Sequence, residues 1–170
     1  MDRQNKEILE FHCPRFNELP KVSLYKDQVI TYIEDVLGVI NLNSEEKLLT
    51  PTMLNNYVKQ KVVSPPKDKK YNEKHIAYLI VVCTLKQVFS LQEICSLINK
   101  QIDTCPTEGA YDFYCIELEK AIKSVFTTRD FSEPSSADKV TYESEIVRSS
   151  VMSFAHKMFI QNYLRTEVYK

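Results

Sequence analysis

The sequence predicts a mostly α-helical protein, folded as one domain or as two small, tightly joined domains. Of its 170 residues, 44% are apolar and 26% are charged, close to the average for soluble globular proteins. Only 2 residues are glycine. Many-stranded β folds rely on glycine in their tight turns, so its scarcity argues against them. Apolar side chains instead recur at helical spacing along most of the chain.

The scarcity of glycine also excludes several enzyme classes. A Walker phosphate loop, a dinucleotide-binding loop and the nucleophile elbow of a hydrolase all need glycines at fixed positions. The three histidines are scattered, and His75 is expected to be a surface or capping residue. No spacing of Ser, Cys, His or Asp predicts a catalytic group or a metal site. We therefore expect neither an enzyme nor a cofactor.

Cysteine usage and hydropathy indicate the compartment. The five cysteines, at positions 13, 83, 95, 105 and 115, form no CxxC motif, so reduced and mostly buried thiols are expected. Metal or redox sensing by Cys105 and Cys115 is the alternative. The longest uncharged run, 76–85, is too short to cross a bilayer, and the N-terminus shows no secretory apolar region. We expect a soluble cytoplasmic protein that makes no membrane contact.

Start and stop signals define the elements of the N-terminal half. The first twenty residues predict a short helix followed by an extended arm. Ser23 is the expected cap of a helix over 24–37. A further short helix is expected to begin at Asn43 or Ser44. Thr50 and the proline after it then open a helix that runs to about residue 60.

A small β-ribbon is expected next. Residues 62–71 contain two adjacent prolines, which exclude a helix. Three lysines and one aspartate follow the prolines at the tip of the ribbon. Asn72 caps the helix that follows, which is predicted to end near Val88. The middle of this helix is apolar on nearly all sides, which is typical of a central, buried helix.

Three more helices are predicted after it. Ser90 and Glu93 form a capping box for a helix to about residue 102. Thr107 is the expected cap of a helix whose aromatic residues either pack in the core or line a ligand pocket; these are Tyr111, Phe113 and Tyr114. After a loop over 128–138, a long helix is expected from about Ala137. Its apolar face either packs on the body or pairs with a second copy.

The helix over 50–60 carries a polar face with no acid. On a helical wheel Met53, Leu54, Tyr57 and Val58 form one side. The opposite side carries Thr52, Asn55, Asn56 and Lys59. Asparagine can bridge the edge of adenine, and lysine can bind guanine or phosphate, so this face suits nucleic acid.

Charge is segregated along the chain. Between residues 50 and 75 there are six lysines and two acids, a net charge of +4, although the whole chain has a net charge of −1. Residues 103–119 carry five acids and no lysine or arginine. The basic part coincides with the polar helix and the ribbon. Such a patch attracts phosphates by releasing counterions.

These residues resemble the MerR-type winged helix-turn-helix. The resemblance rests on Thr52-Met53-Leu54-Asn55-Asn56-Tyr57, Val62-Val63, Pro65-Pro66, Lys69-Lys70-Tyr71-Asn72 and the stretch from Lys86 to Ile94. With Leu19-Pro20 and Leu24 to Val29, the chain is most similar to an uncharacterised bacterial family of MerR-like proteins, a domain of unknown function. Lys61 stands where MerR-type proteins have the glycine that ends the recognition helix.

The resemblance implies a mostly α, MerR-like winged helix-turn-helix with a small β-ribbon wing, followed by a C-terminal helical part with one long helix. Residues 1–102 would form the DNA-binding-like domain and residues 103–170 the dimerisation or effector part. The expected function is transcriptional regulation on double-stranded DNA as a homodimer joined by the C-terminal helix. The alternative is a helical protein-interaction module on the same fold, without DNA binding.

The predicted DNA contacts combine the polar helix face and the wing. Asparagine amides would read base edges, and wing lysines would hold phosphates. The predicted residues are Thr52, Asn55, Asn56, Lys59, Lys61, Lys67, Lys69, Lys70 and Tyr71.

Overall fold

The protein is mostly α-helical, as predicted. The computed structural model describes residues 3–102 and 105–168. Within them lie seven α-helices: α1 (Arg3–Leu9), α2 (Lys26–Leu37), α3 (Pro51–Lys59), α4 (Glu73–Leu85), α5 (Leu91–Ile102), α6 (Thr107–Phe126) and α7 (Tyr142–Val168). Two short strands, β1 (Leu24–Tyr25) and β2 (Lys70–Tyr71), pair antiparallel. No helix of this described part is long and apolar enough to cross a membrane.

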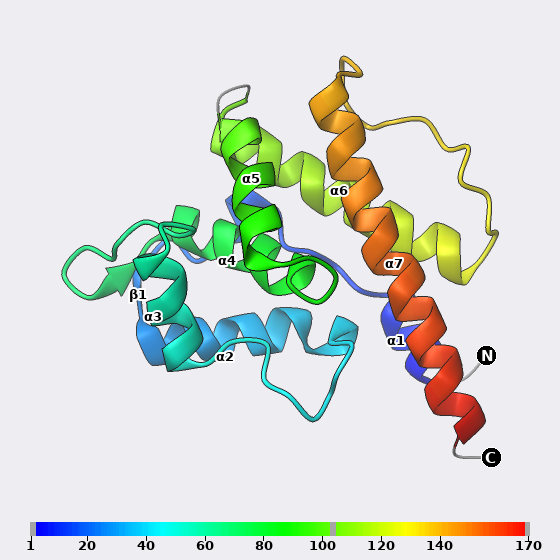
Figure 1. Ribbon diagram of the computed structural model, residues 1–170, viewed down its shortest axis with the longest axis horizontal. Coiled ribbons are helices and arrows are strands. Elements are labelled where there is room, and N and C mark those ends of the chain that lie inside the picture. Colours follow the sequence, from blue (N-terminus) through cyan, green and yellow to red (C-terminus); the bar gives the residue numbers. More distant parts are fainter. Residues whose placement is uncertain (1–2, 103–104, 169–170) are drawn as a thin grey trace.

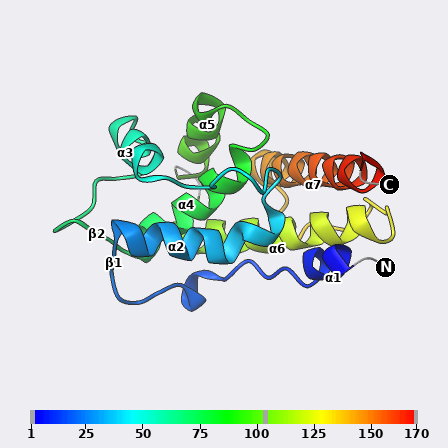
Figure 2. The ribbon, with the colours of Figure 1, turned by 90° about the horizontal axis from the view of Figure 1, so that it is seen from below.

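Helix α4 lies at the centre of the fold. Helices α2, α5, α6 and α7 all contact it. Figures 1 and 2 show α3 and β1 at one end of the molecule, with α1 and the last turns of α7 at the opposite end. One cluster of buried residues runs from Ile8 to Met158, so its members come from both sides of the domain boundary expected at residue 102.

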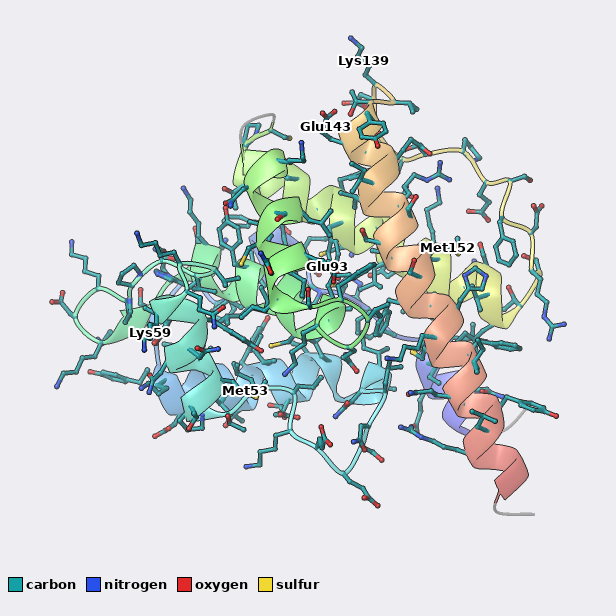
Figure 3. All side chains as sticks on the ribbon, viewed as in Figure 1. Met53, Lys59, Glu93, Lys139, Glu143 and Met152 are labelled. Carbon is teal, nitrogen blue, oxygen red and sulfur yellow. The ribbon has the colours of Figure 1, made fainter. Side chains whose placement is uncertain are left out.

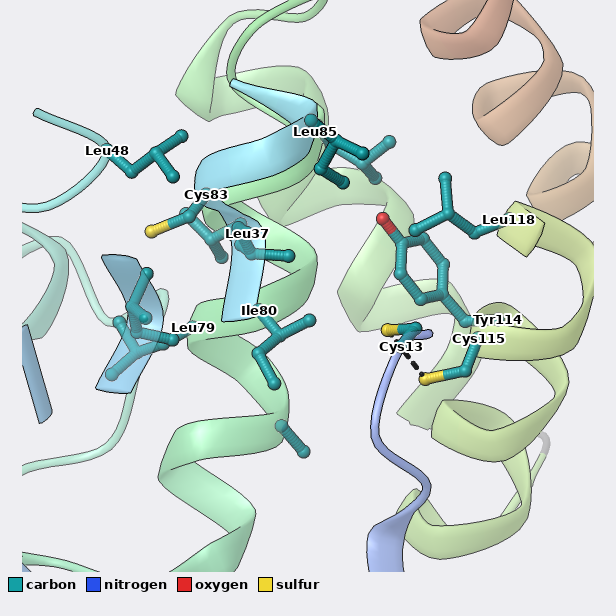
Figure 4. Close-up of a cluster of buried hydrophobic side chains, with 14 of the residues drawn as sticks. Cys13, Leu37, Leu48, Leu79, Ile80, Cys83, Leu85, Tyr114, Cys115 and Leu118 are labelled. Atoms are coloured by element: carbon teal, nitrogen blue, oxygen red, sulfur yellow. Dashed lines mark hydrogen bonds between the residues drawn. The ribbon is translucent and has the colours of Figure 1, made fainter. Parts of the chain in front are cut away.

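The sequence of α4 explains its position. Nine of its thirteen residues are buried, including Leu79, Ile80 and Cys83, which Figure 4 shows on the helix within a cluster of buried side chains. The Asn72 side chain caps the helix by accepting from the backbone N–H groups of Lys74 and His75. Both the cap and the burial confirm the prediction. The helix ends at Leu85 rather than near Val88, because a turn at 86–88 leads into the cap of α5.

Helix α3 begins as predicted and ends in a Schellman motif. The Thr50 hydroxyl accepts from the Met53 N–H at 3.2 Å, and Pro51 is the first helical residue. At the other end, Val62 N donates to Tyr57 O at 2.9 Å and Lys61 N donates to Val58 O at 3.0 Å. Lys61 itself has φ 60°, the left-handed conformation that favours glycine. A side chain at this position costs the protein stability.

The ribbon differs from the predicted one. The predicted helix over 24–37 begins only at Lys26, because Leu24 and Tyr25 pair with Tyr71 and Lys70 as a strand. Within residues 62–71, the only pairing described is a tight hairpin in which Lys67 and Lys70 exchange backbone hydrogen bonds of 3.1 and 2.9 Å. We call residues 67–70 the hairpin.

The hairpin turns without glycine. Its two central residues, Asp68 and Lys69, have φ of 51° and 61°. Positive φ at both central residues defines a type I′ turn, which matches the twist of antiparallel strands and usually contains Asn-Gly. The hairpin therefore stores backbone strain at the same residues that carry its charge.

The short helix expected at Asn43 or Ser44 does not form. The stretch is a turn in which Asn41 and Asn43 side chains bond nearby backbone groups. Such local bonds compete with helical ones. Two flanking leucines, Leu42 and Leu49, are buried and hold the segment against the body.

The last three helices begin within five residues of their predicted starts. Glu93 accepts from the N–H and hydroxyl of Ser90 at 2.8 Å each, which confirms the predicted capping box of α5. In α6, Thr107 is the first helical residue and not the cap. Helix α7 starts at Tyr142, five residues later than predicted, after reciprocal bonds between Thr141 and Ser144.

The loop before α7 is held against α6 by one buried and two half-buried charged residues, which explains the late start of that helix. Glu117, with 4% of its side chain exposed, accepts from Ser136 N at 2.8 Å and from Arg148 Nε at 3.0 Å. Arg148 also donates to Glu133 O at 2.7 Å, and Lys120 donates to Pro134 O at 2.6 Å. These bonds hold residues 133–136 in a loop.

The N-terminal arm is fixed to α6. The Arg15 guanidinium donates to both carboxylate oxygens of Glu119 at 2.8 and 2.7 Å, and Glu119 also accepts from Cys13 N at 2.8 Å. The Cys13 and Cys115 sulfurs lie 3.2 Å apart (Figure 4). Their hydrogen bond, together with burial, raises the pKa of the Cys13 thiol. Three of the five cysteines are buried, and all five are free thiols.

The left-handed residue after α3 allows a stability test. Replacing Lys61 by glycine should raise the free energy of unfolding by about 1 kcal/mol, because the Cβ penalty in the left-handed region is removed. Lys59→Gly, two residues earlier in the helix, should instead lower it by about 0.5–1 kcal/mol. Urea unfolding measures both. A Lys61→Gly variant less stable than the native protein would contradict the Schellman assignment.

The Glu117 cluster makes stability depend on pH. Burial raises the pKa of Glu117, but bonds from Ser136 and the charges of Lys120 and Arg148 outweigh it, so its pKa falls below the ordinary 4.5. The ionised form thus stabilises the fold above about pH 4.5, and this stabilisation is lost as pH falls through the native pKa. Glu117→Gln should cost about 1–3 kcal/mol at pH 7 and much less at pH 3.

Urea unfolding at both pH values checks this expectation. Glu45→Gln, at an exposed position of the 41–50 loop, is the matched control and should show no such dependence. A deficit of Glu117→Gln that is equal at pH 7 and pH 3 would show that the ionised carboxylate is not what stabilises the contact.

Candidate nucleic-acid interface

The polar face of α3 points to solvent. Its four predicted contact residues, Thr52, Asn55, Asn56 and Lys59, are exposed. On the opposite side, Leu54 is fully buried and Tyr57 is 4% exposed, so the helical wheel drawn from the sequence is confirmed. Met53 and Lys59 mark the two ends of the helix in Figure 3.

Helix α3 and the segment before it are held to the body of the protein by contacts with α2 and with the end of α4. The Lys86 ammonium donates to the carbonyl of Leu48 and lies 3.8 Å from the Met53 sulfur. Burial lowers the pKa of Lys86. The hydrogen bond from Leu49 N to Glu34 Oε1, 3.2 Å long, ties the segment before α3 to α2. The polar face is therefore carried by a helix anchored to both α2 and the end of α4.

Four lysines lie at the end of α3 and on the hairpin. Lys61, Lys67 and Lys69 are exposed, and Lys70 is half-buried. The Lys70 ammonium lies over the Tyr25 ring, 4.9 Å from its centroid. Aromatic faces attract cations, so this contact helps to hold the hairpin in place.

Tyr71 does not belong to the exposed surface. Only 2% of it is exposed, which corrects the prediction that it contacts DNA. Its ring packs edge-on against His75, with ring centroids 5.5 Å apart, and burial raises its pKa. His75 is a capping residue as expected, but it is buried rather than on the surface: Nδ1 accepts from Asn72 N at 3.0 Å, and Nε2 lies 3.1 Å from Ser64 Oγ.

Two residues outside the predicted set join this surface. Lys26, the first residue of α2, donates to Asn55 Oδ1 at 2.7 Å. Tyr25 beside it is 54% exposed. Together with Asn55, Pro66 and Lys69 they line a shallow concavity between α3 and the hairpin. The sequence alone does not predict that Tyr25 and Lys26 lie here. Their position depends on the pairing of Leu24 with Tyr71, two residues that are far apart in the chain.

We give the name α3–hairpin surface to a set of residues of which Lys26 and Lys70 are half-buried and the others exposed: Tyr25, Lys26, Thr52, Asn55, Asn56, Lys59, Lys61, Lys67, Lys69 and Lys70. Two acids accompany it, Asp68 at the hairpin turn and Asp27 in the concavity. Glu73 nearby is paired with Lys21 at 3.6 Å. The surface is therefore basic overall.

Three of the five acids of 103–119 bind the N-terminal arm or α7. Asp112 accepts from Phe16 N at 2.7 Å, and Glu117 and Glu119 bind arginines. Asp103 lies outside the described residues. Within the described residues, no group of three or more histidines, cysteines and acids is placed to hold a metal ion.

Comparisons with known proteins identify one match. Residues 14–132 match the sequence model of a family described as a domain of unknown function, DUF1836. The matched range runs from the N-terminal arm through α6 and includes the whole α3–hairpin surface, whereas α7 lies beyond it. No curated protein and no solved structure matches the chain.

Proposed function

The chain belongs to the DUF1836 family, a domain of unknown function, and we propose that it is a transcriptional regulator that binds double-stranded DNA through the α3–hairpin surface. One observation carries the proposal. An exposed polar helix face and a lysine-tipped hairpin lie side by side at one end of the molecule, on helices anchored to a buried core.

The dimensions of this surface suit duplex DNA. An α-helix with its side chains is about 10–12 Å across, and the major groove of DNA is about 12 Å wide, so it admits one helix such as α3. With α3 in the groove, the neighbouring hairpin would reach the phosphates beside it. Lys67 and Lys69 carry flexible ammonium groups that can neutralise those phosphates without reading sequence.

The two asparagines would read base edges. A side-chain amide can donate to N7 and accept from N6 of adenine. The Lys26 ammonium already donates to Asn55 Oδ1 at 2.7 Å, which orients this amide before DNA binds. Asn56 Oδ1 similarly accepts from Gln60 Nε2 at 3.1 Å. Amides held in one orientation lose less entropy on binding than free ones.

The order of elements also favours this function. Helix α3, the hairpin and α4 follow one another in the order that the resemblance to MerR-type regulators implies. In such an arrangement α3 would be the recognition helix and the hairpin a short wing. Lys61 departs from the MerR-type pattern, which has glycine at this position, although its left-handed backbone is the conformation that favours glycine.

Two-fold DNA sites call for a dimer, and α7 offers a surface for one. Its first half packs on α6, with Val151, Phe154 and Ala155 buried. Near its end Ile160, Tyr163 and Leu164, at helical spacing, are 57%, 58% and 53% exposed. We propose that this stripe pairs with the same stripe of a second copy.

The hairpin lysines provide the test of DNA binding. Lys67→Ala with Lys69→Ala should weaken binding to every duplex and reduce the slope of log K against log salt by about 2, because two phosphate contacts are lost. Lys70 is left intact because it also packs on Tyr25. Fluorescence anisotropy with random-sequence duplex at several salt concentrations measures both quantities.

The control removes the same charge elsewhere. Lys123→Ala with Lys139→Ala changes two exposed lysines at the end of α6 and before α7; Figure 3 shows Lys139 far from Lys59. This variant should keep the native slope. Equal slopes for both double variants, or no duplex binding by the native protein, would reject the DNA-binding proposal and favour a protein-interaction module.

The dimer is tested separately. Ile160→Glu with Leu164→Glu would place charges in the paired stripe, and we expect sedimentation equilibrium to show a dimer for the native chain and a monomer for the variant. Ser149→Glu with Ser153→Glu, at exposed positions of the same helix, should leave the dimer intact. A monomeric native protein at micromolar concentration would contradict this role of α7.

A further inference from the structure

Two buried cysteines from distant parts of the chain lie in contact. Cys13 belongs to the N-terminal arm and Cys115 to α6, 102 residues later, and neither side chain is exposed to solvent. Their sulfurs are 3.2 Å apart, and Figure 4 shows the two thiols directed toward each other from the arm and the helix. Of the two cysteines for which the sequence leaves redox sensing as an alternative, Cys115 therefore has Cys13 as its neighbour.

The geometry of the pair suits a disulfide. A disulfide bond is about 2.05 Å long, so the two sulfurs would have to approach by about 1 Å. Cys115 is fixed in the middle of α6, but Cys13 lies in the stretch 11–15, which forms neither helix nor strand. The arm can therefore supply the movement without breaking the hydrogen bonds of a helix.

The contacts of the arm control access to the two thiols. Glu119 accepts from Cys13 N at 2.8 Å and binds the Arg15 guanidinium through both oxygens, and Asp112 accepts from Phe16 N at 2.7 Å. The hydrogen bond between the thiols, together with burial, raises the pKa of Cys13. Because the thiolate is the reactive form of cysteine, the pair is protected while the arm stays closed.

We propose that Cys13 and Cys115 form a reversible disulfide in the presence of a peroxide, and that opening of the N-terminal arm limits the rate of this reaction. The disulfide would lock the arm onto α6. This inference does not rest on DNA binding, since the pair includes no residue of the α3–hairpin surface.

The reaction balances with hydrogen peroxide as the oxidant. One thiolate attacks a peroxide oxygen and the O–O bond breaks, which leaves a sulfenic acid and a hydroxide that takes up the proton lost by the thiol. The other thiolate attacks the sulfenic sulfur and the S–O bond breaks, and the hydroxide released takes up the second thiol proton. In total the two thiols lose two electrons and two protons, and the peroxide becomes two water molecules.

The test begins with a variant that lacks the two half-buried cysteines. Cys95→Ser with Cys105→Ser leaves three of the five thiols. After treatment of the folded variant with hydrogen peroxide, thiol titration in urea should fall from three thiols per chain to one, and dithiothreitol should restore all three. The oxidised form should unfold at a higher temperature than the reduced form, because the cross-link restricts the unfolded chain.

Mass mapping locates the bond. Residues 101–119 contain no lysine or arginine, so trypsin leaves Cys115 on the peptide 101–120 and Cys13 on the peptide 7–15. These two peptides should be linked after oxidation. Cys13→Ser in the same variant should keep both remaining thiols, since Cys83 is buried in α4 and its pKa rises to about 12.

The rate tests the role of the arm. Glu119→Gln weakens the charged contacts that hold the arm closed, so it should speed disulfide formation by about tenfold. Glu108→Gln makes the same change at an exposed position of α6 and should keep the parent rate. The inference is overturned if all three thiols survive the peroxide, if Cys13→Ser loses thiols as fast as its parent, if oxidation does not raise the unfolding temperature, or if Glu119→Gln reacts at the rate of Glu108→Gln.

Discussion

The burial of α4 is the constraint on which the rest of the structure depends. A helix that is apolar on nearly all sides is stable in water only when other elements cover every side. Helix α2 covers one side, and α6 and α7 cover another. The two polar side chains buried in α4 are both hydrogen-bonded: Thr84 to Ile80 O, and His75 within the cap formed by Asn72. Because these helices must cover α4, the positions of the segments that connect them are restricted as well.

That constraint places the α3–hairpin surface. The hairpin precedes the first residue of α4, and Tyr71 and His75 anchor it in the core. The chain has no glycine here, so Lys61 and Lys69 adopt left-handed conformations at a cost of about 1–2 kcal/mol each, and Asp68 adopts one at a lower cost. Backbone strain of this kind persists only where the surroundings hold it, and it gathers at functional positions more often than elsewhere. Here it coincides with three charged residues of one exposed edge.

Helix α4 also connects the α3–hairpin surface to the C-terminal helices. Its cap fixes the hairpin, while Val81 and Leu85 line a small cavity among α4, α5, α6 and α7. The buried carboxylate of Glu117 joins α6 to α7 through the half-buried Arg148. The N-terminal arm is bound to α6 through the Arg15–Glu119 pair. The α3–hairpin surface is therefore built on helices whose positions are fixed by tertiary contacts.

The sequence by itself determined the features that depend on interactions between neighbouring residues. Helical periodicity, the caps at Thr50, Asn72 and Ser90 and the polar face of α3 act over a few residues, so they could be recognised from the chain. Only the tertiary structure decided the pairing of Leu24 with Tyr71, the burial of Tyr71 and the place of Lys26 beside Asn55. Each of these depends on residues far apart in the sequence, whose contacts form only when the chain closes around α4.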